Sequence, residues 1–195
     1  YLSGRLEDLI DLSAGSGVGL IGGLSAVLIF EHGWPAPLAM LVGLVAASGI
    51  WLGMGTIIVK ERVPAFIITL GGMAVYRGVA FALTQGQSIS ELPDSFIKGF
   101  FKAEIGGVNP VPMAVMLVVA GLGAFFLSRT VKGRQSYAVG GNETAARYAG
   151  VPVGGVKIMW YVLCGLLAGL AASMMLGYYG SASSDSGQGY ELKVI

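Results

Sequence analysis

Charged residues are scarce in this chain. Of its 195 residues, 12 are Lys or Arg and 11 are Asp or Glu, which makes 12% charged; a soluble domain carries about 25%. By contrast, 54% of the residues are hydrophobic and 32 are Gly. A soluble domain of this size could not hide so much apolar surface from water. Disorder is also excluded, because it requires low hydrophobicity and high net charge, and the net charge is +1.

Cysteine and histidine are equally scarce, and each shortage removes a class of function. The single cysteine, Cys164, excludes an intrachain disulfide framework and a multi-cysteine metal site. His32 is the only histidine and lies on a different predicted element, so a hydrolytic centre has no nucleophile and base pair. The near-neutral charge gives no argument for nucleic acid. We expect no enzyme activity, no cofactor, no metal site and no nucleic-acid partner.

The sequence contains one apparent nucleotide-binding motif, and its context excludes that function. Residues 17–22 match the dinucleotide pattern of glycines, but they lie in an apolar run with no strand before them. No phosphate-binding loop of the type Gly-x-x-x-x-Gly-Lys-Ser/Thr occurs anywhere in the chain. If the protein uses ATP, another chain must therefore bind it.

Long apolar runs are what the chain has instead. A helix needs about 20 apolar residues to cross the hydrocarbon core of a bilayer. Five runs approach or exceed that length, at residues 12–30, 35–59, 63–83, 111–128 and 158–179. We predict an all-α integral membrane protein, a polytopic helical bundle of about five spans in a single transmembrane domain over residues 1–195. Because the chain begins without Met and ends as another element would start, we expect it to be a fragment.

Basic residues predict the orientation of the bundle, since cytoplasmic loops carry the excess of Lys and Arg. Strict alternation of the five spans puts seven basic residues on one side and three on the other. The seven are Lys60, Arg62, Arg129, Lys132, Arg134, Arg147 and Lys157. We expect the connection 129–157 to form a cytoplasmic loop.

Small residues spaced four apart predict close packing, because helices in lipid associate through contacts of small side chains. Such residues are Gly15, Gly19 and Gly23, Gly49 and Gly53, and Gly165 and Gly169. Residues 11–17 and 69–72 favour interrupted helices, with ordinary flexible packing as the alternative.

Polar residues in or beside the spans are candidates for a translocation pathway. Arg77 is the one charge well inside a span, where a charge normally faces the bundle interior or a watery cavity, with Tyr76 or Thr69 as partners. The alternative is that its side chain extends to the interface. Asp11 lies at a membrane boundary, where it either lines the pathway or ends a helix. The candidates are Asp11, Ser13, Ser16, Thr69, Tyr76 and Arg77.

The loop 129–157 contains the signals of a short helix. Asn142 fits the N-cap, and Glu143 and Arg147 match the helix dipole in the first and last turns. Gly150 fits the left-handed position that ends a helix. A helix of about two turns held between flexible glycines is not stable alone in water. We therefore expect it to dock on another surface, with a solvated connector as the alternative.

Six motifs follow one another along nearly the whole chain. They are Asp11-Leu12-Ser13-Ala14-Gly15-Ser16, residues 63–71, Tyr76-Arg77-Gly78, Gly133-Arg134, Gly140-Gly141-Asn142-Glu143 with Ala145-Ala146-Arg147, and Gly189-Tyr190-Glu191-Leu192. In this order they resemble the permease subunits of bacterial sugar ABC importers of the ribose/xylose type.

The resemblance implies a permease homodimer in the bacterial inner membrane that moves a monosaccharide inward. It implies a cytoplasmic ATP-binding cassette subunit and a periplasmic sugar-binding protein as partners. It also implies that the short helix is the coupling helix that contacts the ATPase, and that the pathway candidates lie near the translocation path. The coupling residues would be Gly140, Gly141, Asn142, Glu143, Ala145, Ala146, Arg147 and Tyr148.

Two departures from the family pattern keep alternatives open. The family has a further span before the Asp-Leu-Ser motif, where this chain has only residues 6–10, and it commonly has an acid at the position of Lys193. A truncated, non-transporting membrane subunit is therefore one alternative. A secondary transporter or channel is another, although no acid is expected in the middle of any span, where proton-coupled carriers usually have one.

Overall fold

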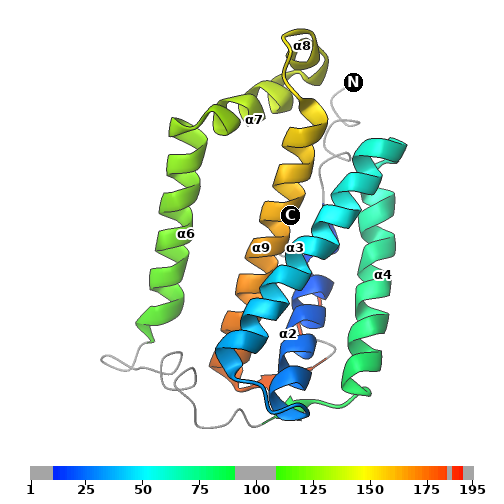
Figure 1. The fold of residues 1–195 in the computed structure, drawn as a ribbon, viewed down its shortest axis with the longest axis vertical. Coiled ribbons are helices and arrows are strands. Elements are labelled where there is room, and N and C mark those ends of the chain that lie inside the picture. Colours follow the sequence, from blue (N-terminus) through cyan, green and yellow to red (C-terminus); the bar gives the residue numbers. More distant parts are fainter. Residues whose placement is uncertain (1–10, 91–108, 184–185, 191–195) are drawn as a thin grey trace.

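The computed structural model describes residues 11–90, 109–183 and 186–190, and these residues are mainly helical (Figure 1). The elements in chain order are α2 (Ala14–Phe30), α3 (Ala36–Glu61), α4 (Ala65–Thr84), β1 (Ile89–Ser90), α6 (Pro110–Arg129), α7 (Val131–Gly141), α8 (Glu143–Tyr148), α9 (Val153–Tyr179) and β2 (Ser181–Ala182). The helical architecture predicted from composition is confirmed. The family residues Glu191 and Leu192, the basic residues Lys98 and Lys102, and the segment 1–10 lie outside the described residues.

Within the residues that the structure describes, four helices are long and apolar enough to cross a membrane. They are α3, α4, α6 and α9, with lengths of 20 to 27 residues. They match four of the five predicted spans. Helix α9 begins at Val153 rather than at the predicted Ile158, because Pro152 takes the N-cap position and Lys157 is accommodated inside the helix.

The fifth predicted span, α2, differs from the other four. It has only 17 residues, and 13 of them are buried. It lies in the centre of the bundle, in contact with α3, α4 and α9 (Figure 1). A helix that is apolar on all sides is typical of such an enclosed position.

The core forms where α3 crosses α2 and α9. The Trp51 ring of α3 is fully buried against Gly17 of α2, and a methyl group at Gly17 would overlap it. On the other side, a methyl group at Gly165 of α9 would lie 2.8 Å from the Cβ of Trp51. Gly169, one turn further along α9, packs in the same way against Leu44 and Ala47. The predicted close packing at Gly165 and Gly169 is confirmed.

Two other expectations about glycines are wrong. A methyl group at Gly49 or Gly53 would meet nothing within 4 Å, so these residues form no close contact. Helix α4 also runs without interruption through residues 69–72. Glycine weakens a helix by about 1 kcal/mol, whereas each unsatisfied backbone group in lipid costs several kcal/mol. A continuous helix therefore has the lower free energy for these residues.

Helix α6 stands apart from the central bundle and is joined to it by α7 (Figure 1). No residue of α6 is buried, although Phe126 near its end meets Trp160 of α9 edge to face, with ring centroids 6.2 Å apart. At the corner, the Oγ1 of Thr130 accepts a hydrogen bond from the Gly133 N–H at 2.9 Å. A methyl group at Gly133 would overlap the carbonyl oxygens of Phe126 and Leu127, so glycine permits this tight corner.

Helix α7 was not expected from the sequence. Gly140 and Gly141 form its last residues, so they are not the flexible segment predicted before the short helix. The two-turn helix α8 follows α7 directly, with Asn142 between them. The connection therefore consists of two consecutive helices that carry α8 to one end of the molecule, which we call the α8 end (Figure 1). The opposite end carries β1 and β2, paired antiparallel with Ile89 opposite Ala182, and we call it the strand end.

Candidate functional site

Helix α8 has the boundaries and the cap that its sequence predicts. The Oδ1 of Asn142 accepts a hydrogen bond from the Ala145 N–H at 3.0 Å. Gly150 has the left-handed backbone expected of a helix stop, with φ of +81°. Within the helix, the Arg147 guanidinium donates to Glu143 at 3.1 Å, one turn away. The local signals of capping and charge were therefore sufficient to define this element.

A second ion pair attaches α8 to α9. The Nζ of Lys157 donates to the other carboxylate oxygen of Glu143 at 2.7 Å. This hydrogen bond from Lys157 is the main reason that the pKa of Glu143 is lowered, and the charges of Lys157 and Arg147 lower it further. Because Lys157 belongs to the first turns of α9, the pair links the short helix directly to a membrane span.

The rest of α8 faces outward. Tyr148 is 89% exposed, whereas Ala146 is buried against the protein. Thr144, Ala145 and Arg147 are exposed as well. The helix, which lies at the α8 end of the molecule, thus presents a small exposed face with an aromatic ring and a cation.

A groove of about 1480 Å³ opens beside α8 and extends into the bundle between α3, α7 and α9. Glu143, Arg147 and Lys157 line it near α8. Asp11 and Cys164 line it at the other extreme. The groove therefore connects the proposed coupling residues with one of the proposed pathway residues.

The carboxylate of Asp11 joins three elements of the bundle. One oxygen accepts hydrogen bonds from the backbone N–H and the hydroxyl of Ser13, at 2.8 and 2.6 Å. The other accepts from the indole N–H of Trp51 at 2.7 Å and from the Cys164 thiol at 3.5 Å. Trp51 and Cys164 lie near the middle of α3 and α9. Asp11, which directly precedes the first predicted span, therefore lies level with the middle of two other helices, because α2 begins inside the bundle and not at its surface.

The serines that follow Asp11 also direct their hydroxyls inward. Ser13 is fully buried, and its hydroxyl also lies 3.8 Å from the sulfur of Met54. The hydroxyl of Ser16 donates to the Ser13 carbonyl at 2.8 Å. Both hydroxyls therefore satisfy polar atoms at the start of α2.

The three candidates on α4 are only partly brought to this cluster. Tyr76 is buried, its hydroxyl lies 3.6 Å from the sulfur of Met54, and its ring centroid lies 5.6 Å from that of Trp51. Thr69 is fully buried and donates to the Phe66 carbonyl at 3.3 Å, within its own helix. Arg77 is half-buried on α4. The structure thus gathers Asp11, Ser13 and Tyr76 around α3.

Sequence analysis missed two features of the site. Trp51 and Cys164 are ordinary apolar residues in their spans, and only their contact with Asp11 gives them a polar role. The second feature is formed by residues 180–183 and 186–190 after α9, which lie against the bundle beside α2. Its glycines at 180, 187 and 189, all with positive φ, were the signal that could have identified it. In the described part of the chain, no group of three His, Cys, Asp or Glu side chains could hold a metal ion.

Comparison with known proteins gives a consistent picture. The chain is 37% identical over 186 residues to the autoinducer 2 import system permease protein LsrC of Enterobacter sp. (strain 638), covering 95% of this chain and 53% of LsrC. It is 38% identical over 190 residues to the ribose import permease protein RbsC of Escherichia coli K12, and 32% identical over 186 residues to the D-allose transport system permease protein AlsC of the same strain. These matches cover 95% of this chain in both cases, with 58% of RbsC and 56% of AlsC. No solved structure matches the chain.

The chain thus spans little more than half the length of these relatives. The family described as the permease component of the branched-chain amino acid transport system matches residues 3–195, which is nearly the whole sequence. With this match and its bundle of apolar helices, the chain belongs to that family of transport permease components.

Proposed function

We propose that this chain works as the transmembrane permease part of an ATP-driven importer for a monosaccharide of the ribose class. The family match supports a role in transport, and relatives named for import of ribose and allose support a sugar as the substrate. A relative named for autoinducer 2 import has similar identity, so the substrate assignment is coarser than the transport role. Because the chain covers just over half of each relative, transport is a property of the complete protein.

The observation that carries this proposal is the construction of α8. It is a capped helix with an exposed Tyr148 and Arg147, attached to the span α9 through the pair of Glu143 and Lys157. A two-turn helix is too short to be stable in water by itself. Such an exposed element suits contact with a partner, and its attachment to α9 suits the transfer of movement to the membrane spans.

In this mechanism the chain performs no chemistry of its own. A cytoplasmic ATP-binding cassette subunit contacts α8 and closes on ATP, and the ion pair transfers that displacement to α9. A second permease copy completes the pathway, and an external binding protein delivers the sugar. The residues proposed for coupling are 140–143 and 145–148, and those proposed for the pathway include Asp11, Ser13 and Tyr76.

Two kinds of variant separate docking from transmission in the complete transporter reconstituted in liposomes. Replacing both Arg147 and Tyr148 with Ala removes the exposed face of α8, and we expect loss of ATPase co-purification together with sugar-stimulated ATP hydrolysis. Lys157→Met breaks the attachment to α9 and leaves that face intact. This variant should retain the ATPase subunit and lose most of the stimulation.

Tyr137→Ala is the matched control, because this tyrosine is 67% exposed on α7, outside the proposed coupling residues. It should leave assembly and hydrolysis unchanged. If the Arg147 and Tyr148 double variant retains both properties, the coupling assignment is wrong. Sugar uptake driven by a pH gradient without any ATPase would instead favour a secondary transporter, for which Asp11 is the intramembrane acid.

A further inference from the structure

The chain re-enters the bundle after α9. Gly180, in the left-handed conformation with φ of +65°, ends the helix at the strand end, and β2 pairs with β1. Gly187 then lies against the carbonyl oxygen of Gly15, the second residue of α2, and a methyl group at Gly187 would overlap that oxygen. Because α2 begins near the middle of α3 and α9, residues 181–183 and 186–189 bring non-helical backbone beside it within the bundle. In membrane proteins such backbone is tolerated where protein buries it or where it lines a cavity.

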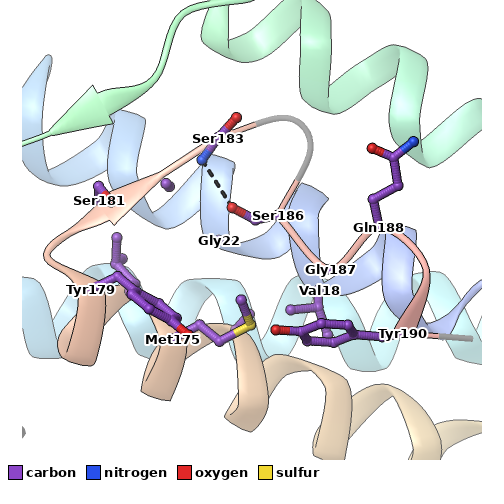
Figure 2. A pocket seen from close by; sticks show the side chains of 13 residues that line it. Val18, Gly22, Met175, Tyr179, Ser181, Ser183, Ser186, Gly187, Gln188 and Tyr190 are labelled. Carbon is purple, nitrogen blue, oxygen red and sulfur yellow. Dashed lines mark hydrogen bonds between the residues drawn. The ribbon is translucent and has the colours of Figure 1, made fainter. Parts of the chain in front are cut away.

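A cavity of about 290 Å³ lies between this segment, α2 and α9 (Figure 2). From the re-entrant segment, the polar residues Ser181, Ser183, Ser186 and Gln188 line it. The Ser186 hydroxyl accepts a hydrogen bond from the Ser183 N–H at 3.1 Å (Figure 2). The cavity volume is close to the lower limit of ~300 Å³ for small-molecule sites, so the ligand it suits is small.

The opposite wall of the cavity is apolar. Val18 of α2 and Met175 and Leu176 of α9 form it, and the rings of Tyr179 and Tyr190 border the space (Figure 2). Among the described lining residues none carries a charge, so none of them would pair with a phosphate or carboxylate group. Small polar residues on one side, with apolar and aromatic groups on the other, suit a neutral ring that has both hydroxyl groups and C–H faces.

Gly22 keeps this cavity open. It lies on α2 and lines the cavity, and a methyl group built at its position meets no atom within 4 Å (Figure 2). Gly17, on the same helix, has no such space, because the Trp51 ring occupies it. A side chain at Gly22 would therefore extend into the cavity and not into a neighbouring helix.

We propose that this cavity is a binding site for one neutral monosaccharide ring, formed by the re-entrant segment together with α2 and α9. The inference rests on the proposed transport function and adds a specific site to it. No residue of α8 is among the described residues that line the cavity. The two assignments therefore use different residues and can fail separately.

The first test compares two glycine-to-leucine variants in the complete transporter. Gly22→Leu fills the cavity, and we expect uptake of radiolabelled D-ribose and D-allose to fall at least tenfold. Gly49→Leu is the matched control, because a methyl group at Gly49 also meets no atom within 4 Å but faces outward from α3. It should transport at the rate of the unmodified protein. ATPase co-purification should be unchanged in both variants, since α8 is intact.

Transport by Gly22→Leu at the unmodified rate would overturn the proposed site. If the unmodified transporter moves neither sugar and shows no sugar-stimulated ATP hydrolysis, the proposed function fails, which is a different result. A second measurement covers the case in which Gly22→Leu does not assemble. It uses Ser181→Cys in a Cys164→Ala background, with a methanethiosulfonate reagent and millimolar D-ribose.

We expect ribose to slow modification of the new cysteine at least threefold and D-ribose 5-phosphate to have no effect. Ser128→Cys in α6, which lies outside the cavity lining, should react at the same rate with and without sugar. Unchanged modification in the presence of ribose would overturn the proposal, and so would a cysteine at position 181 that the reagent cannot reach.

Discussion

At the scale of single residues, the meaning of Asp11 depends on its neighbours. In the sequence, Asp11 is one of 11 acidic residues and directly precedes an apolar run. In the structure its carboxylate accepts hydrogen bonds from Ser13, Trp51 and Cys164, which belong to three parts of the bundle. A charged acceptor with several donors is stabilised even where water is scarce. The Asp11 carboxylate therefore links three parts of the bundle where the groove reaches into it.

Replacing Asp11 with Asn tests this role. The amide group brings an N–H₂ donor to face either the Trp51 indole or the Ser13 donors, so one set of hydrogen bonds is lost. Hydrogen bonds to charged groups contribute about 1.5–3 kcal/mol each, so we expect a loss of stability on the order of 2 kcal/mol. Thermal unfolding in detergent, followed by circular dichroism, measures it. Glu31→Gln, at the exposed other end of α2, should unfold like the unmodified protein. If Asp11→Asn is as stable as the unmodified protein, the hydrogen bonds of Asp11 do not hold these elements together.

At the scale of elements, the connection between α6 and α9 is a built structure and not a flexible loop. Thr130 and Gly133 form the corner between α6 and α7, and Asn142 caps α8. The pair of Glu143 and Lys157 then attaches α8 to α9. The whole connection thus holds a short exposed helix in a defined position relative to a span.

The attachment of α8 should depend on pH. The pKa of Glu143 is lowered in the folded state, so the carboxylate stabilises the attachment above its unfolded pKa of about 4.3. That contribution is lost as the pH falls below this value and through the lowered pKa of the folded state. A spin label on an introduced Cys at Ala149, in a Cys164→Ala background, should report greater mobility at pH 3 than at pH 7.

Glu143→Gln should show the mobile spectrum at both pH values, because the amide cannot form the ion pair. Identical spectra at pH 3 and pH 7 in the unmodified background would mean that the ion pair does not hold α8.

At the scale of the whole molecule, the arrangement matches a bilayer. The four long helices expose apolar side chains such as Leu41, Phe81 and Leu122, which lipid can cover, while α2 is enclosed. Together with its family, this makes the chain a multi-pass protein of the bacterial inner membrane. Lipid tails are as apolar as leucine, so the hydrophobic effect contributes little to the association of helices in a membrane. Close contacts at glycines hold the bundle together instead.

Gly165→Val tests the packing of α3 against α9. The new side chain would overlap Trp51 and the carbonyl oxygen of Ala47, which already lies 2.9 Å from a methyl group at this position. Overpacking of this kind costs about 1–3 kcal/mol, so the unfolding midpoint should fall. Gly53→Val is the control, because Gly53 of α3 faces open space. An unchanged unfolding midpoint for Gly165→Val would mean that α3 and α9 can move apart to accept the larger side chain without a loss of stability.

Sequence analysis predicted much of this fold and less of the site. The four long spans, the α8 cap at Asn142 and the close packing at Gly165 follow from local patterns of hydrophobicity and spacing, and all are present. Gly53 has the same spacing signal as Gly165 and makes no contact, because spacing does not say which face of a helix meets a neighbour. The partners of Asp11 on other helices, Trp51 and Cys164, are 40 and 153 residues away in the chain, beyond the range of any local pattern.

Local sequence patterns define this chain as a helical membrane protein and locate its long helices and the short capped helix. These properties depend on the length of apolar runs and on residues within one or two turns of each other. The packing of the helices is what makes α2 begin inside the bundle, joins three elements at Asp11, and forms a cavity beside Gly22 after α9. Those features arise from contacts between segments far apart in the chain, which form only when the helices pack together.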